Sequence, residues 1–318
     1  MQLYAPTDLT SIKNAIYNNS AVYLSYCSDS AYLNTATNSY YCLEDIDTNH
    51  AVTIVYCSSN KLTQLDLSEN PKLETVECYL NQLSSLDVSN CSNLQTLQCF
   101  NNQLSSIDLS GKTKLTELKC ADNQLSSLDL SDCTALKTLS CTTNVLESLD
   151  LTKNVNIDYV ECSENKLTEL LIPDVETIGT LYCNKNNLVC FNLNNTEVTS
   201  FSMDDNVRNI GAVKSDFDMS GFKGFDPSKV SRWSGAEYDA EKNVFTDFTA
   251  LTVTYSYYCG QTKYVTVTLQ ADSVEDMYMT IDECIDYVNA IDLSDTCTEL
   301  SDKQLKAIER VLEYDYSK

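Results

Sequence analysis

The sequence predicts a solenoid, a coil of short stacked turns built mainly of β-structure, and three observations carry this prediction. The tripeptide Asn-x-Leu recurs every 21 residues from Asn60 to Asn186, and cysteine recurs with the same step from Cys57 to Cys183. Within a turn the apolar residues alternate, which is the period of a β-strand. A fixed repeat of about twenty residues or more is typical of solenoids, in which each turn packs only against its neighbours.

Residues 73–88 show the plan of one turn. Alternation around residues 76–78 predicts a main strand, and alternation around Asp87 predicts a second, shorter extended segment on the opposite side. We expect the apolar side chains to point inward, where stacked turns bury them at a gain of roughly 1.5–3 kcal/mol each. The inward residues of this turn are Leu73, Val76, Cys78, Leu83, Leu86 and Val88.

An asparagine follows each main strand. Its short amide side chain can bond backbone groups that a sharp turn leaves unpaired, so we expect a structural ladder in preference to a ligand site. A shortened copy of the repeat ends at Asn206. The ladder positions are Asn60, Asn81, Asn102, Asn123, Asn144, Asn165 and Asn186.

This pattern resembles the leucine-rich repeat family. The signature Leu-x-x-Leu-x-Leu-x-x-Asn-x-Leu is present with cysteine at the third apolar position, and the Leu-x-x-Leu-Asp-Leu-Ser half is similar to the short 21-residue bacterial class called IRREKO-type. The resemblance covers residues 51–207 in eight copies. It implies an α/β-solenoid of leucine-rich repeats that is mainly β, with parallel strands on the concave face. It also implies a binding scaffold without chemistry of its own.

Seven of the 15 cysteines share one inward position. Neighbouring parallel strands lie about 4.8 Å apart with their Cβ vectors side by side, which suits a disulfide poorly. A straight, dry row also lacks the convergent geometry of a zinc site, so we expect reduced, buried thiols and no metal. The row consists of Cys57, Cys78, Cys99, Cys120, Cys141, Cys162 and Cys183, with Met203 in the last copy.

The segments outside the repeats are expected to form caps and a separate module. Residues 1–50 are predicted as an N-terminal cap with a short helix near Thr7, and Cys27 and Cys42 either pair there or stay free. Residues 208–271 are predicted as a linker followed by a small β module, because residues 251–269 read as a β-hairpin. Residues 272–318 are predicted as a C-terminal helical segment with two amphipathic helices.

Composition limits the partners and the location. The formal net charge of −25 argues against nucleic acid, which needs clustered Lys and Arg, and it suits either solubility or a basic protein partner. No apolar run reaches membrane-spanning length, and the first residues do not read as a signal peptide. We expect an extracellular or cell-surface bacterial protein in mature form, with a cytoplasmic location as the alternative.

The sequence predicts no enzymatic activity and no cofactor. His50 is the single histidine, and no nucleophile motif surrounds it. A row of evenly spaced aspartates, from Asp66 to Asp150, lacks the close oxygen clusters of a calcium site, so turn hydrogen bonds are the favoured interpretation. Trp233, the one tryptophan, is expected to anchor packing.

Recognition is expected on the outward face of the main strands. Tyr56, Tyr79, Leu80 and Phe100 lie on three successive turns, and such aromatic patches often mark partner sites. The alternative is that Tyr79 and Phe100 only stack and support the sheet. Acidic residues follow in the later turns, beginning with Glu117 and Asp122. A glycan-binding adhesion module and a docking component of a larger assembly are the competing functional hypotheses.

Overall fold

The computed structural model describes residues 2–3, 21–24, 53–59, 62–67, 70–214 and 216–274, and the chain divides into two compact units. The first unit comprises residues 1–208 and 257–267, and the second comprises residues 209–256 and 268–318. Asn60, His50, Cys27 and Cys42 lie outside the described residues.

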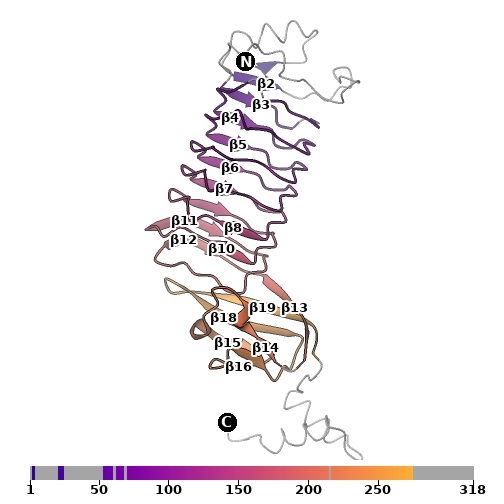
Figure 1. Cartoon of the computed structure of the whole chain (residues 1–318), viewed down its shortest axis with the longest axis vertical. Helices are drawn as coiled ribbons and strands as arrows, with labels where there is room; N and C mark the ends of the chain where they lie inside the picture. The colour runs from indigo at the N-terminus through magenta and orange to yellow at the C-terminus, as the bar shows by residue number, and fades with distance from the viewer. Residues whose placement is uncertain are drawn as a thin grey trace, which may run out of the picture. The chain divides into compact units, whose positions relative to one another are not determined.

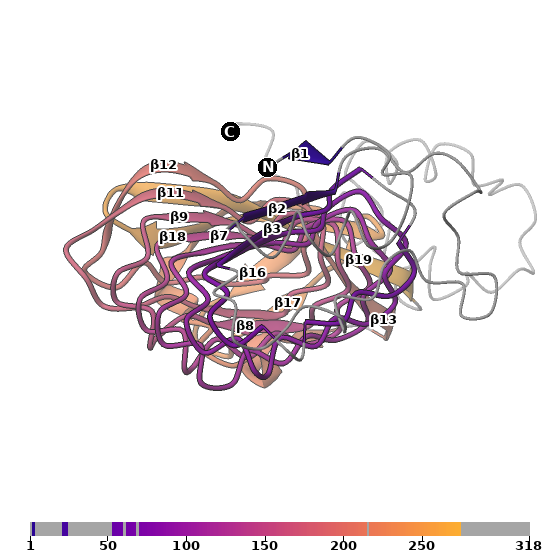
Figure 2. The ribbon, with the colours of Figure 1, turned by 90° about the horizontal axis from the view of Figure 1, so that it is seen from above.

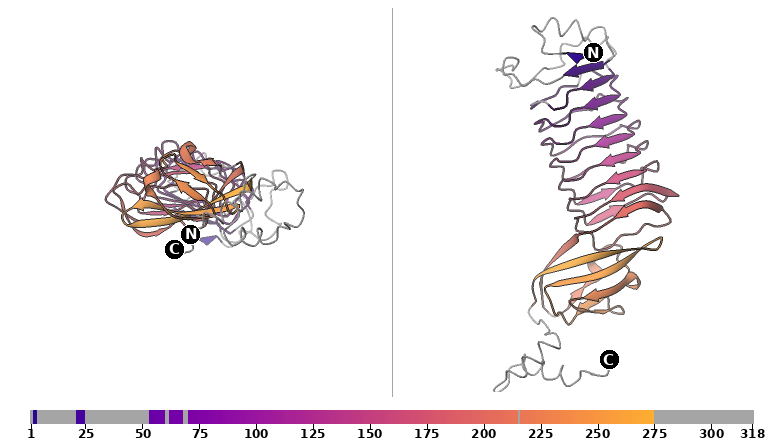
Figure 3. Two further views of the ribbon diagram at one scale, coloured as in Figure 1. Left: turned by 90° about the horizontal axis from the view of Figure 1, so that it is seen from below. Right: turned by 180° about the vertical axis from the view of Figure 1, so that it is seen from behind.

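The first unit is a parallel β-solenoid, as the repeat predicts. Its sheet has ten strands, starting with β1 (Gln2–Leu3) and β2 (Ala21–Leu24), and each strand lies beside the strand of the next turn (Figure 1; Figure 3). Neighbouring strands pair in register with an offset of one repeat, for example Val76 with Leu97. The other main strands are β3 (Ile54–Tyr56), β4 (Thr75–Glu77), β5 (Thr96–Gln98), β6 (Glu117–Lys119), β7 (Thr138–Ser140), β9 (Tyr159–Glu161), β11 (Thr177–Tyr182) and β12 (Glu197–Ser202).

The second segment of each turn runs along the opposite side of the coil (Figure 2). In two turns it forms strands, β8 (Ser148–Asp150) and β10 (Glu169–Leu171), which pair in parallel. The inward side chains of both segments meet in one core, in which Leu73, Val76 and Leu83 are fully buried. The predicted inward register is therefore confirmed.

The cysteine row lies inside this core. All seven thiols from Cys57 to Cys183 are fully buried and free, and Met203 continues the row. Burial raises the pKa of Cys57 and of Cys99 to about 12, so these thiols stay protonated at neutral pH. Protonated, shielded thiols pack as small apolar groups.

The ends of the repeat region differ from the predicted caps. Strands β1 and β2 lengthen the parallel sheet upstream of β3, so the described parts of residues 1–50 continue the coil. At the other end, residues 257–267 belong to the repeat unit. The Leu193 N–H donates to the Cys259 carbonyl over 2.8 Å, and the Gln261 amide donates to the Asn195 carbonyl.

The second unit is built of short strands, where the sequence suggests a linker followed by a hairpin. Between residues 217 and 246, Gly, Pro and Ser separate strands of only two to five residues, and this obscures the alternation that would reveal those strands. Tyr238, Phe245 and Tyr255 form its aromatic core, with the Phe245 ring 4.7 Å from Tyr238 and 5.6 Å from Tyr255. From residue 206 onward the strands are β13 (Asn206–Val213), β14 (Phe217–Asp218), β15 (Val230–Ser234), β16 (Glu237–Asp239), β17 (Val244–Thr246), β18 (Thr252–Gly260) and β19 (Lys263–Val274). The parts of β18 and β19 within residues 257–267 belong to the first unit.

These strands form two sheets, one in the order β13-β19-β18-β15 and one in the order β14-β17-β16. The alternating segments predicted as a hairpin are thus the two inner strands of a larger sheet. Strand β19 extends to Val274, beyond the predicted start of the helical segment at residue 272. The described residues contain no α-helix, only the 3-10 turns η3 (Met219–Gly221) and η4 (Pro227–Lys229). The two helices predicted to follow lie outside the described part.

Candidate functional site

The strand face is the outward side of the main strands, together with the two residues after each inward cysteine. In the three-residue strands of the repeats the central residue is buried, and the flanking residues are half-buried. Residues at the same place in successive turns therefore form straight rows across this face. Side chains in these rows can be substituted without disturbing the core, so the face is suited to recognition.

The asparagine ladder fixes the edge of this face. The Asn144 amide group donates to the carbonyls of Cys120 and Cys141, each over 3.0 Å, and its Oδ1 accepts from the Leu125 N–H over 2.9 Å. The Cys141 carbonyl also accepts from Asn165, so successive asparagines share carbonyls. These bonds satisfy backbone groups that the turn would otherwise leave unpaired. The same pattern holds from Asn81 to Asn206.

A row of left-handed residues precedes the ladder. Leu80 has φ 55°, and the equivalent residues of the other turns have φ between 52° and 57°. Asparagine and aspartate tolerate this conformation, whereas a bulky apolar residue is strained in it. Asn101 and Asp122 suit the position, and Leu80 does not. The Leu80 side chain is also 47% exposed, so the fold gains little from it.

Substitution of Leu80 consequently tests whether its side chain stabilises the fold or serves another role. We expect Leu80→Asn to raise the free energy of unfolding by about 1 kcal/mol, because asparagine relieves the left-handed strain. The reciprocal change Asn101→Leu should lower it by a similar amount. Urea denaturation of both variants measures this. A stability loss in both variants would show that Leu80 makes contacts the fold requires.

Two of the predicted site residues form a close aromatic pair. The rings of Tyr79 and Phe100 are stacked, with centroids 4.4 Å apart and planes at 5°, and both side chains are half-buried. Tyr56 lies one strand earlier, aligned with Glu77. We call Tyr56, Tyr79, Leu80 and Phe100 the aromatic cluster. The stacking that the alternative interpretation requires is present, and it leaves part of both rings accessible.

Acidic and basic groups lie beside the aromatic cluster. Glu117 Oε1 accepts from the Gln98 amide over 2.9 Å and lies 2.7 Å from Lys119 Nζ. Burial raises the pKa of the Glu77 carboxyl, the charge of Glu117 raises it further, and Lys119 lowers it. A raised carboxyl pKa means that ionised Glu77 opposes folding, and this cost appears as the pH rises through that pKa.

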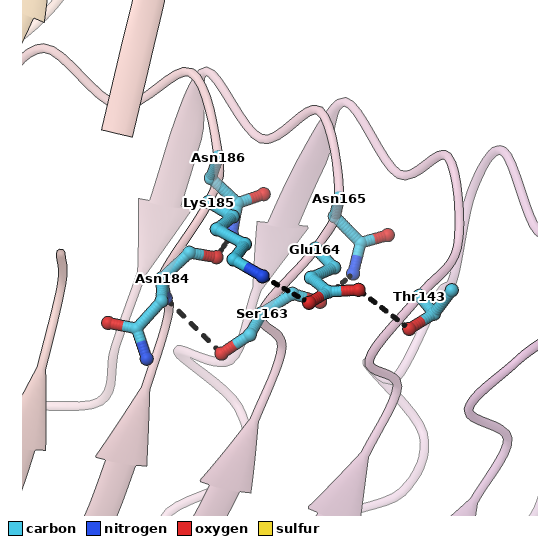
Figure 4. Close-up of polar contacts among 7 residues, drawn as sticks. All are labelled: Thr143, Ser163, Glu164, Asn165, Asn184, Lys185 and Asn186. Carbon is cyan, nitrogen blue, oxygen red and sulfur yellow. Dashed lines mark hydrogen bonds and ion pairs between the residues drawn. The ribbon is translucent and has the colours of Figure 1, made fainter. Parts of the chain in front are cut away.

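The later turns are polar (Figure 4). Lys185 Nζ lies 2.7 Å from Glu164 Oε1, and this hydrogen bond and charge lower the pKa of Glu164. The Ser163 hydroxyl accepts from the Asn184 N–H over 3.2 Å. Asp122, a predicted site residue, lies in the left-handed row, and its carboxylate is 3.5 Å from the amide of Asn101, which directly follows Phe100.

The aspartates on the opposite side serve local turns. Asp108 Oδ1 accepts from the Ser110 N–H over 2.9 Å, and Asp87 and Asp129 do the same two residues ahead. Hydrogen bonds from Ser110 lower the pKa of Asp108. These bonds account for the regular row without a bound ion. Within the described residues, no cluster of three or more potential metal-ligating side chains occurs.

The structure also reveals a buried cation that the sequence pattern did not single out. Lys112 is 2% exposed, and its ammonium group donates to the carbonyls of Ser89 and Ser110. It occupies the place that Cys91 and Cys133 hold in the adjacent turns. The signal was available in the repeat alignment, where a lysine replaces an apolar residue at a turn corner.

The sequence matches no protein-family profile and no curated protein. Solved structures that resemble it are leucine-rich repeat proteins. The functional domain of InlJ from Listeria monocytogenes, which includes a cysteine ladder, is 22% identical, with a TM-score of 0.40 over 74% of this chain and 65% of that one. The leucine-rich effector YopM from Yersinia pestis is 21% identical, with a TM-score of 0.38 over 50% of this chain and 54% of that one.

An internalin from Listeria monocytogenes, InlF, is 21% identical, with a TM-score of 0.34 over 39% of this chain and 43% of that one. In all three comparisons the match covers less than two thirds of the other chain. None of the described helical turns is long and apolar enough to cross a membrane.

Proposed function

We propose that the chain is a non-catalytic protein-binding scaffold of leucine-rich repeats, and that its aromatic cluster is the centre of the binding surface. The observation that carries this proposal is the half-exposed stack of Tyr79 on Phe100. The next turns place Ala121, Thr142 and Ser163 at the same position, so the coil folds there without aromatic side chains. Large rings at positions where small residues suffice favour a role in recognition.

The properties of the cluster favour a protein partner. Aromatic side chains bring a large contact area while losing little conformational entropy, and such residues dominate the energetics of protein interfaces. The stacked pair is already ordered before a partner arrives, which lowers the entropy lost on binding. Glu117, Asp122 and the overall charge of −25 would attract a basic partner and make its association rate fall with salt.

The proposed setting is the surface of a bacterium or its secreted proteins. The 21-residue repeat and its Leu-x-x-Leu-Asp-Leu-Ser half support assignment to the short bacterial class. A cytoplasmic location is the alternative, and the free buried thiols are compatible with both, because shielded thiols resist oxidation.

A carbohydrate-binding adhesion module is the second candidate. Sugars stack on flat aromatic faces, and the parallel rings of Tyr79 and Phe100 are only half-buried. A glycan array with the whole protein separates the candidates. Binding of a defined sugar that depends on both rings would favour adhesion over a protein partner.

The double variant Tyr79→Ala/Phe100→Ala tests the proposed surface. We expect at least about a 30-fold loss of affinity for a protein captured by the immobilised wild type, because hot-spot residues each contribute about 2 kcal/mol or more. The free energy of unfolding should fall by a few kcal/mol at most, because the stacked pair contributes about 0.5–1.5 kcal/mol and the burial of each half-buried ring roughly 1 kcal/mol. Surface plasmon resonance measures the affinity, and thermal unfolding measures the stability.

Tyr264→Ala is the matched control, since this tyrosine is 62% exposed and lies outside the strand face. Its affinity should equal that of the wild type. Unchanged binding in the double variant, or equal losses in the control, would contradict the proposed surface and direct attention to the second unit.

A further inference from the structure

Glu77 lies at the centre of the aromatic cluster, although the sequence pattern gave it no special role. The strand register places it between Tyr56 on β3 and Gln98 on β5. Tyr79 follows two residues later and therefore points to the same side of the sheet. One carboxylate thus has a tyrosine on the preceding strand and a second tyrosine, itself stacked on Phe100, two residues further along the chain, just beyond the end of β4.

No ion pair to Glu77 occurs among the described residues of this face, although the nearby charge of Lys119 partly offsets that of the carboxylate. Two ion pairs occur among the described residues of the strand face, Lys119 with Glu117 and Lys185 with Glu164, and neither includes Glu77. Lys119 is held 2.7 Å from Glu117 Oε1, so its positive charge is already committed to another carboxylate. The Glu77 side chain is half-buried, and Glu117 adds a second negative charge nearby.

A partly desolvated carboxylate beside tyrosine rings suits one kind of ligand group. A cation placed there gains an ion pair with the carboxylate and an attraction to the electron-rich ring faces. A guanidinium group fits better than an ammonium group, because it is planar, binds a carboxylate through two hydrogen bonds and stacks on aromatic rings. Its arrival would also offset the repulsion between Glu77 and Glu117.

We infer that Glu77 is the anchor for an arginine side chain of the protein partner, with the guanidinium group on the carboxylate and against the ring of Tyr56 or Tyr79. This inference rests on the proposed function and specifies the chemistry of the partner. The occupant is a protein segment that presents arginine, and the charge complementarity of the acidic chain favours it over a neutral ligand.

The test uses a displayed library of random peptides, selected on the whole protein and counter-selected on Tyr79→Ala/Phe100→Ala. We expect the enriched peptides to share an arginine. Replacing that arginine with citrulline, which is neutral and nearly the same shape, should weaken binding at least tenfold. Glu77→Gln should weaken binding of the arginine peptide by a similar factor. The arginine and citrulline peptides should then bind this variant with equal affinity.

Glu164→Gln is the control, because this carboxylate on the same face is already paired with Lys185. It should leave affinity unchanged within about twofold, the ordinary range for a charge outside the binding site. The melting temperature of Glu77→Gln should equal or exceed that of the wild type, which shows that any loss of binding is not a loss of fold.

The outcomes separate this inference from the proposed function. Peptides whose binding needs Tyr79 and Phe100 but survives Glu77→Gln would overturn the arginine anchor and leave the binding surface intact. Enrichment of peptides without basic residues would do the same. Failure of the counter-selection to remove any binder would contradict both, because the peptides would then bind elsewhere.

Discussion

Replacing Asn144 with alanine is expected to lower the free energy of unfolding by about 3–5 kcal/mol. The change removes two hydrogen bonds to the carbonyls of Cys120 and Cys141, each of which is worth about 1 kcal/mol. It also leaves the buried Leu125 N–H without its acceptor, at a further loss of about 1–3 kcal/mol. Urea denaturation followed by circular dichroism measures the effect.

The control is Asn156→Ala in the next turn. This asparagine is exposed and makes one hydrogen bond, to the Thr134 carbonyl, so its replacement should lower stability by about 0.5–1.5 kcal/mol at most. Equal losses of stability in the two variants would contradict the claim that the asparagine ladder stabilises the stacked turns. The two carbonyls keep partners in Asn144→Ala, since Asn123 and Asn165 also bond them, and the coil should therefore still fold.

Leu125→Ala is the second substitution with a large expected effect. Leu125 is fully buried in a central turn, and removing three of its carbon atoms should lower stability by about 2–5 kcal/mol through lost burial and a cavity. The midpoint of urea unfolding should fall accordingly, at an unchanged dependence on urea concentration.

Thr142→Ala provides the contrast, on the strand face of the next turn. Thr142 directly follows the inward Cys141, so the repeat predicts an outward, exposed side chain. Its hydroxyl is nevertheless buried and lacks a hydrogen-bond partner in the described structure. Alanine removes that unsatisfied group, so stability should stay within about 0.5 kcal/mol of the wild type or rise slightly. A loss as large as that of Leu125→Ala would mean that the inward and outward assignments are wrong.

The repeat region could be predicted from the sequence because every turn must bury apolar residues and satisfy the same backbone hydrogen bonds. The inward cysteine and the alternating leucines mark buried positions, and the asparagine marks a hydrogen-bonded turn. Because this pattern occurs in eight copies, the register is unambiguous. The second unit offered no such redundancy. Strands as short as Phe217–Asp218 carry too few residues to show a period, and their pairing depends on contacts distant in sequence.

The candidate site was predictable only in part. Outward positions follow from the register, so the sequence alone places Tyr56, Tyr79 and Phe100 on one face. The strain at Leu80 could not, because the left-handed backbone of that row appears only in three dimensions. The environment of Glu77 also depends on which carboxylate captures Lys119, which is a matter of side-chain geometry.

Hydrogen–deuterium exchange of the whole protein, with and without a captured partner or selected peptide, tests the central claim most directly. Mass spectrometry of peptic fragments reports which backbone amides the partner shields. The proposed binding surface predicts slower exchange confined to residues 54–59, 75–80 and 96–101, which carry the aromatic cluster and Glu77. Protection confined to residues 230–256 of the second unit, with no change across the strand face, would contradict it.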